Sequence, residues 1–175
     1  MPAASDSNPV IELLSKHHNR AAFDCDVDGL TRYIRQLAVQ DVKKKVAASF
    51  VLLGDTLSTI AGYYTLSSTN VDVVELPEPV VRKLPHYPIM PATLIGRLAV
   101  DRHYQSRGYG ELLLVDALRR SLKLTEQIGS VAVIVDAKDN KARSFYEHFQ
   151  FIPLINYSYR LFLPMAVIQN YFTHE

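Results

Sequence analysis

The chain has 175 residues, of which 48% are apolar and 21% charged, a composition typical of one globular domain with a buried core. Its net charge of +1 excludes a general attraction to nucleic acid, so any such binding must rest on a local patch. A single cysteine excludes an internal disulfide, and the chain shows neither a secretory signal nor an apolar run near the ~20 residues of a membrane helix, so we expect a cytoplasmic protein that does not bind membranes.

The first part of the chain predicts a strand and a helix within a single domain of residues 1–175. Residues 1–9 are small and polar and are expected to be flexible, and residues 10–14 form a first short strand. A helix capped by Asp26 or Asp28 follows and runs to about residue 44. Its apolar side chains lie on one helical face: Leu30, Tyr33, Ile34, Leu37, Ala38 and Val42.

The middle of the chain predicts a β-hairpin. Residues 46–53 and 59–68 are two apolar runs that flank a glycine-containing turn, and residues 71–75 are expected to extend the sheet. Residues 76–91 carry five of the nine prolines, which predicts a long irregular excursion over the surface.

A βαβ unit follows. Residues 94–100 predict a strand, the turn at 105–110 contains two glycines, and residues 108–126 predict an amphipathic helix. Leucines repeat every four residues along this helix and are expected to be buried: Leu114, Leu118 and Leu122. Residues 131–135 are fully apolar and β-branched, as in a strand covered on both faces and parallel to the first.

The remaining elements complete an α+β fold with a mixed sheet. Asn140 is expected to cap a helix that runs to about residue 149, and strands are expected at residues 151–155 and 157–163. A short last helix is expected to begin at Pro164.

The turn Gln105–Gly110 has the properties of an anion-binding site. The first amides of a helix lack an intrahelical acceptor and can donate to a phosphate, the glycines let backbone approach a ligand, and Arg107 can add a charge. No Lys-Ser/Thr pair follows Gly110, which excludes a Walker loop, and the dinucleotide fingerprint needs a third glycine. The alternative is that the turn only caps the helix that follows it and binds no ligand.

The motif Gln-x-x-Gly-x-Gly after an apolar strand resembles the pyrophosphate-binding motif of GNAT acetyltransferases. The resemblance implies a GNAT-like domain, whose loop amides bind the pyrophosphate of acetyl-CoA and whose preceding strand pairs with the pantetheine arm, and it implies no metal. The implied cofactor-binding residues are Leu98, Ala99, Val100, Gln105, Ser106, Arg107, Gly108, Tyr109 and Gly110.

The same resemblance assigns roles to two residues of the following helix. Asn140 stands where an asparagine of GNAT enzymes bonds the pantetheine arm, and Tyr146 stands where a tyrosine lies beside the thioester sulfur. A neutral phenol, with a pKa near ~10, can supply a proton to a departing thiolate, so Tyr146 is the candidate general acid. The alternatives are a plain helix cap at Asn140 and a half-buried packing residue at Tyr146.

No general base is recognisable in the sequence. The six histidines are scattered without nucleophile–base or metal spacing, and Cys25 is expected to be a buried structural thiol. The absence of a recognisable base points to an acceptor amine that does not need a general base to remove its proton. An α-amino group with a pKa near ~8 is partly neutral already, whereas a lysine amine near ~10.4 is not.

A narrower resemblance covers roughly residues 12–165. The segments Phe23-Asp24-Cys25, AGYYTLS from residue 61, IGRLAVD from residue 95 and LFLPM from residue 161 are similar to the GNAT toxins of type II toxin–antitoxin modules. The resemblance implies acetylation of the α-amine of aminoacyl-tRNA, inhibition of translation, a ribbon-helix-helix antitoxin and a homodimer. Asp26 and Gln150 stand where family members usually have glycine.

A tRNA substrate requires cationic surface. Basic residues are expected on the polar side of the first helix and around the proline-rich excursion: Arg32, Arg35, Lys43, Arg82, Lys83 and Arg97. We expect Arg97, just before the cofactor strand, to lie nearest the acceptor end. The alternative is an ordinary solvated helix face.

Two other functions fit parts of this pattern. The glycine turn and Tyr146 suit a GNAT enzyme that acetylates a small amine or a protein N-terminus equally well. A non-catalytic acyl-CoA sensor would keep the turn but would not need the tyrosine.

Overall fold

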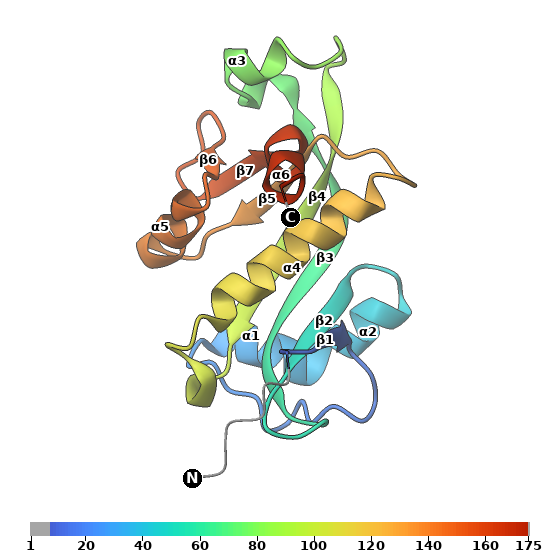
Figure 1. Ribbon diagram of the computed structural model, residues 1–175, viewed down its shortest axis with the longest axis vertical. Helices are drawn as coiled ribbons and strands as arrows, with labels where there is room; N and C mark the ends of the chain where they lie inside the picture. Colours follow the sequence, from blue (N-terminus) through green and yellow to red (C-terminus); the bar gives the residue numbers. More distant parts are fainter. Residues whose placement is uncertain (1–7, 175) are drawn as a thin grey trace. The chain divides into compact units, whose positions relative to one another are not determined.

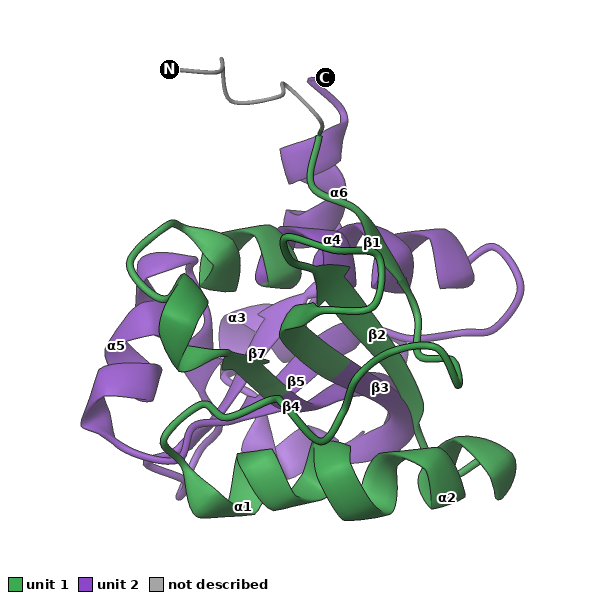
Figure 2. Cartoon of the chain, turned by 90° about the horizontal axis from the view of Figure 1, so that it is seen from below, with its two compact units in different colours: residues 1–64, 98–113 green, residues 65–97, 114–175 purple. Residues whose placement is uncertain are grey.

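The computed structural model describes residues 8–174. Contacts divide the chain into two compact units, one of residues 1–64 and 98–113 and the other of residues 65–97 and 114–175 (Figure 2). The flexible segment expected at residues 1–9 lies mostly outside the described residues. Within residues 8–174, no helix is both long and apolar enough to cross a membrane.

Seven strands form one mixed sheet in the order β1-β2-β3-β4-β5-β7-β6 (Figure 1). Their bounds are β1 Ile11–Leu13, β2 Ala48–Leu53, β3 Ile60–Asp72, β4 Ile89–Val100, β5 Ala132–Asp136, β6 Ile152–Pro153 and β7 Arg160–Pro164. β1 runs antiparallel to β2, β4 parallel to β5, and β7 antiparallel to both β5 and β6. The α+β class and the parallel βαβ unit, with α4 (Tyr109–Leu124) as its crossover, are confirmed.

The first helix is interrupted by a π-helical turn that the sequence did not predict. Three segments follow one another: α1 (Asp28–Arg32), the π-helix η1 (Tyr33–Leu37) and α2 (Ala38–Lys43). The turn closes with the amide of Ala38 donating to the carbonyl of Tyr33, which inserts one residue into the helical repeat. Leu37 is therefore 41% exposed instead of lying on the buried face. The predicted caps are also wrong, because Val27 occupies the cap position without a side-chain bond.

The core of the first unit brings the end of β4 close to the start of α4. Phe23, Tyr33 and Tyr63 pack their rings together, and the Tyr63 hydroxyl donates to the carbonyl of Leu30 at 2.7 Å. A Cβ atom at Gly62 would lie 2.8 Å from Leu113 Cδ1 and 2.9 Å from the carbonyl oxygen of Ala99. The absence of a side chain at Gly62 thus allows β3 to pack closely against the end of β4 and the start of α4.

The second unit contains β5, which is buried on both faces as expected, and the rest of α4. Leu114 and Leu118 are buried, whereas Leu122 is only partly buried. Ser121 is the buried neighbour, and its hydroxyl donates to the carbonyl of Ala117 at 2.7 Å. The buried stripe therefore shifts by one residue toward the end of the helix.

The proline-rich excursion is more regular than predicted. β3 ends at Asp72, and the residues expected to extend the sheet form a 3₁₀ turn, Val73–Glu75. A short helix, α3 (Glu78–Val81), follows, because prolines are compatible with a first helical turn. The predicted helices after β5 and β7 are confirmed as α5 (Asn140–His148) and α6 (Met165–Phe172).

Candidate active site

The glycine turn lies in the first unit, between the end of β4 and the start of α4. β4 ends with Leu98–Val100, a 3₁₀ turn (Arg102–Tyr104) follows, and α4 begins at Tyr109. Ser106 and Gly108 both have a positive φ, 63° and 78°. The amide of Leu112 donates to the carbonyl of Gly108 at 3.2 Å, so the three amides before it have no acceptor within the helix and are available to a phosphate.

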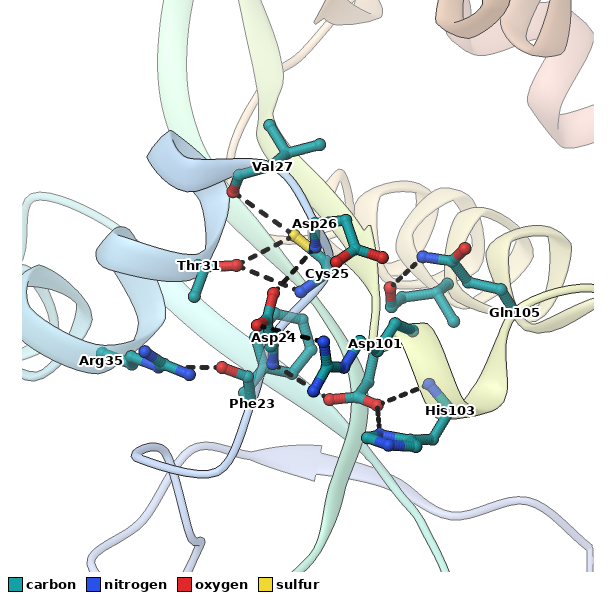
Figure 3. A network of polar contacts seen from close by, with 12 residues as sticks. Phe23, Asp24, Cys25, Asp26, Val27, Thr31, Arg35, Asp101, His103 and Gln105 are labelled. Atoms are coloured by element: carbon teal, nitrogen blue, oxygen red, sulfur yellow. Dashed lines mark hydrogen bonds and ion pairs between the residues drawn. The ribbon is translucent and has the colours of Figure 1, made fainter.

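A buried carboxylate fixes the backbone ahead of this turn (Figure 3). Asp101 is 4% exposed. Its Oδ2 accepts from the amide of Asp24 at 3.0 Å, and its Oδ1 accepts from the amide of His103 at 2.9 Å and lies 3.0 Å from His103 Nδ1. Asp101 thus caps the 3₁₀ turn and ties it to the segment before α1. The sequence offered only a polar residue directly after an apolar strand, and we assigned it no role.

Two side chains of the turn, those of Gln105 and Arg107, donate to backbone carbonyls that lie just before the turn. Gln105 Nε2 donates to the carbonyl of Val100 at 3.2 Å, which closes the loop onto the strand end (Figure 3). The guanidinium of Arg107 donates to the carbonyl of His103 at 3.1 Å and lies 5.0 Å over the ring of Tyr104. Arg107 also lines a cavity of about 640 Å³. Its expected direct contact with a phosphate stays a prediction.

Asn140 opens α5 in the second unit but does not cap it. Asp139 is the cap, and its Oδ1 accepts from the amide of Ala142 at 2.8 Å. The side-chain oxygen of Asn140 instead accepts from the hydroxyl of Tyr159 at 2.7 Å. This bond orients the amide and leaves its NH₂ group available to a ligand. No sequence motif indicates that Tyr159 reaches Asn140 across 19 residues.

Tyr146 is a buried phenol on the same helix. It is 7% exposed, and its ring packs edge-on against Phe145 at 5.2 Å and Phe151 at 5.5 Å. Burial raises the pKa of Tyr146 well above its usual value, and the negative charge of Asp136 raises it further. The hydroxyl is therefore protonated at neutral pH and can act as a donor.

The end of α5 holds this ring in place. The amide of Gln150 donates to the carbonyl of Glu147 at 3.0 Å, and the amide of Phe151 donates to the carbonyl of Tyr146 at 3.2 Å. These are the two bonds of a Schellman motif, and the contact between Phe151 and Tyr146 is its hydrophobic part. Gln150 has a φ of 72° and Asp26 a φ of 64°, so both departures from glycine occupy left-handed positions.

The predicted cationic residues differ in their contacts. Arg35 Nε donates to the carbonyl of Phe23 at 2.9 Å, and Arg32 Nε bonds the side chain of Gln36 at 3.3 Å. In the second unit, Arg82 pairs with Glu78 at 2.7 Å. The side chains of Lys43 and Lys83 are exposed, and Arg97 is partly buried in β4.

The fold also gathers two histidines that the sequence analysis left scattered. The nearest ligand atoms of Glu12, His17 and His18 lie within 4.8 Å of one another. His18 Nδ1 accepts from the amide of Ser15 at 2.9 Å, so the ring proton is on Nε2, which donates to Glu12 at 2.7 Å. That tautomer leaves no lone pair on Nε2 for a metal. Cys25 is buried as predicted, with its sulfur 3.4 Å from the hydroxyl of Thr31.

Comparison with known proteins places these features in one family. The family model described as Acetyltransferase (GNAT) domain matches residues 50–153, a range that contains the glycine turn, Asn140 and Tyr146. The chain belongs to the GNAT acetyltransferase family.

Several members of this GNAT family resemble the chain over most of its length. It is 30% identical to a probable toxin TacT of Sinorhizobium fredii, over 92% of this chain and 93% of the relative. It is 36% identical to a tRNA-acetylating toxin of Mycobacterium tuberculosis, over 74% of this chain and 76% of the relative.

Solved structures of GNAT toxins have the same fold. AtaT complexed with acetyl-methionyl-tRNAfMet superposes with a TM-score of 0.87 at 29% identity and covers 95% of this chain and all of that one. A tyrosine-to-phenylalanine mutant of AtaT, bound to the C-terminus of the antitoxin AtaR and to acetyl-CoA, gives a TM-score of 0.80 at 26% identity, over 95% and 99% of the two chains.

Proposed function

We propose that this GNAT protein transfers acetyl from acetyl-CoA to the α-amine of aminoacyl-tRNA and thereby blocks translation. The observation that carries the proposal is the likeness, over 95% of this chain, to AtaT complexed with acetyl-methionyl-tRNAfMet, together with 36% identity over 74% of the chain to a tRNA-acetylating toxin. The anion-binding turn and the buried, protonated Tyr146 supply the chemistry that such a reaction needs.

Acetyl-CoA is bound in two places in this proposal. The free amides at the start of α4 donate to its pyrophosphate, and the backbone of Leu98–Val100 pairs with the pantetheine arm. On the second unit, the NH₂ group of Asn140 donates to the same arm, held in direction by Tyr159.

Acyl transfer follows from the positions of the donor groups. The neutral α-amine attacks the thioester carbon, a C–N bond forms, and the C–S bond breaks. Tyr146 donates a hydrogen bond to the sulfur as negative charge develops, and its proton passes to the departing thiolate. The nitrogen of the adduct loses one proton to water, and Tyr146 regains a proton from water. No general base is needed because an α-amine, with a pKa near ~8 or lower in an ester, is partly neutral before it attacks.

The biological setting follows from the substrate. We propose that the protein acts in the cytoplasm, where charged tRNA is found, as the toxin of a type II pair. Its partners would be a ribbon-helix-helix antitoxin and a second copy of the chain in a homodimer. The structure of AtaT with the C-terminus of AtaR supports the antitoxin.

The test is transfer of radiolabelled acetyl from acetyl-CoA to charged and to deacylated total tRNA. We expect label only on charged tRNA, and a fall of at least about 100-fold for Tyr146→Phe, the range that loss of a general acid gives. Tyr171→Phe, an exposed tyrosine on α6, is the matched control. Label on protein N-termini or small amines, with none on tRNA, would favour the other enzymatic function. Binding of acetyl-CoA with no transfer to any amine would favour the sensor.

A further inference from the structure

The connection between β6 and β7 presents exposed aromatic rings next to α5. Tyr157 and Tyr159 are 45% and 43% exposed, so neither ring is part of the core. Both belong to the second unit, as do Asn140 and Tyr146. A large exposed ring outside the core is a candidate binding surface.

Both rings are fixed although they are exposed. The Tyr159 hydroxyl donates to Asn140 at 2.7 Å, and the Tyr157 hydroxyl donates to Glu75 at 3.1 Å. The backbone is held as well, because the amide of Ala137 donates to the carbonyl of Tyr159 at 2.7 Å and the amide of Tyr157 to that of Leu154 at 3.0 Å. A ring that is already held loses little entropy when a flat ligand stacks on it.

Tyr159 contacts the helix that carries the candidate acid. Its hydroxyl contacts the first residue of α5, and Tyr146 follows six residues later, which corresponds to roughly 9 Å along the helix axis. In an aminoacyl-tRNA the reactive amine is joined through an ester to the terminal ribose. An amine that reaches Tyr146 therefore brings the terminal nucleoside to the helix that Tyr159 contacts.

Two exposed cations flank Asn140, the residue that Tyr159 contacts. Asp136 pairs with Arg160 at 3.7 Å, and Asp139 is engaged as the cap of α5. Lys138 and Lys141, on either side of Asn140, are exposed and make no ion pair among residues 8–174. These lysines can meet backbone phosphates.

We propose that Tyr159, with Tyr157 beside it in sequence, is a stacking site for the unpaired 3′-terminal bases of tRNA. Single-stranded nucleotides are recognised by stacking on aromatic side chains, with cations nearby for the phosphates. The proposal rests on the proposed function, because that function brings a single-stranded tRNA end to α5. It assigns the recognition of this end to the β6–β7 connection.

The test measures binding of deacylated RNA by fluorescence anisotropy, without acetyl-CoA. The two probes are a mini-helix with an unpaired CCA end and the same duplex without that end. We expect the wild type to bind the first probe about 5- to 100-fold more tightly, the range of one base–aromatic stack. Tyr159→Leu abolishes the preference, whereas Tyr159→Phe retains it because the ring remains. Tyr171→Leu, on α6 and 42% exposed, is the control and retains it.

Three results would overturn the stacking site. They are equal binding of both probes by the wild type, a preference that survives Tyr159→Leu, and a preference that Tyr159→Phe loses as fully as Tyr159→Leu does. A Tyr159→Leu protein that keeps the preference but becomes monomeric would assign the ring to a subunit contact instead. If Tyr159→Leu does not fold, the pair Tyr157→Leu and Tyr157→Phe makes the same comparison.

The RNA assay separates this proposal from the proposed function. Acetylation of charged tRNA by a protein that shows no preference for the CCA end would refute only the stacking site. A preference without any acetylation of charged tRNA would refute the proposed function and support the stacking site.

Discussion

At the scale of single residues, the environment of Tyr146 determines how the reaction depends on pH. Burial and the charge of Asp136 raise the pKa of this phenol, so it keeps its proton beyond the pH at which an exposed tyrosine loses it. The acceptor amine must lose its proton to react, so the reactive fraction of the amine increases as the pH rises. Activity should therefore rise as the amine is deprotonated and should not fall when an ordinary phenol would begin to ionise.

We expect kcat/KM for aminoacyl-tRNA to increase up to about pH 8 and then to stay level to about pH 9.5, because Tyr146 is still protonated there. Initial rates over this range test it, with a parallel sample lacking enzyme to correct for hydrolysis of the ester. A decline that begins below pH 9 would show that the essential acid has an ordinary or lowered pKa and is not Tyr146.

A second prediction at this scale concerns Gln150. Its φ of 72° is a conformation that costs an L-residue about 1 kcal/mol and costs glycine almost nothing. Gln150→Gly should raise the free energy of unfolding by about 0.5–1 kcal/mol, measured by urea denaturation. Gln150→Ala keeps the Cβ and should bring no gain. Asp26→Gly should gain less, since aspartate tolerates this conformation better. Destabilisation by Gln150→Gly would refute this explanation.

At the scale of elements, Asp101 connects the cofactor loop to the segment before α1. Its two oxygens accept from the amides of Asp24 and His103. An asparagine has one acceptor oxygen and one NH₂ group, so it places a donor opposite one of these amides. The Asp101→Asn variant therefore loses one of these two hydrogen bonds, while the turn at residues 105–110 keeps all its residues.

Asp101→Asn should raise the KM for acetyl-CoA about 10-fold and change kcat less than about 3-fold, because roughly 1.4 kcal/mol is a typical cost for one such bond to a charged acceptor. Steady-state kinetics at saturating tRNA separate the two constants. Asp72→Asn, an exposed carboxylate at the end of β3, is the control and should leave both unchanged. A loss confined to kcat would mean that Asp101 does not act through cofactor binding.

A further prediction concerns tRNA binding by the cationic residues of the first helix and of the α3 region. Lys43 and Lys83 are exposed, whereas Arg35 and Arg82 are engaged with protein groups. Lys43→Ala and Lys83→Ala should each weaken tRNA binding and lower the slope of log affinity against log salt by about 0.7–0.9.

Arg97→Ala, at the residue expected nearest the acceptor end, should raise the KM for tRNA more than either lysine variant. Filter binding at several salt concentrations, together with kinetics, tests both statements. Unchanged salt slopes for Lys43→Ala and Lys83→Ala would make these lysines part of an ordinary solvated face. Unchanged kinetics for Arg97→Ala and for the double variant Arg82→Ala/Lys83→Ala would refute the tRNA-binding assignment.

At the scale of the whole molecule, the βαβ unit was predictable because hydrophobic periodicity and the glycine turn are local signals. The π turn at Tyr33–Leu37 was not, since nothing in a 3.6-residue pattern marks an inserted residue. The caps failed for a related reason, as adjacent Asp139 and Asn140 are both good capping residues and only the backbone decides between them.

The candidate site likewise has features that the sequence predicts and features that it does not. The amides of the glycine turn and the position of Tyr146 follow from short motifs, whereas contacts between distant residues do not. The bond from Tyr159 to Asn140 spans 19 residues, and the bond from Asp24 to Asp101 spans 77. Pairings of this kind depend on how strands meet in the sheet, which composition and spacing do not specify.

The most direct test of the central claim is mass spectrometry of the aminoacyl groups released from charged total tRNA after incubation with the protein and acetyl-CoA. We predict N-acetylated amino acids from the wild-type reaction and none above background with Tyr146→Phe. Charged tRNA that releases only unmodified amino acids, while the protein acetylates another amine at a comparable rate, would contradict the account.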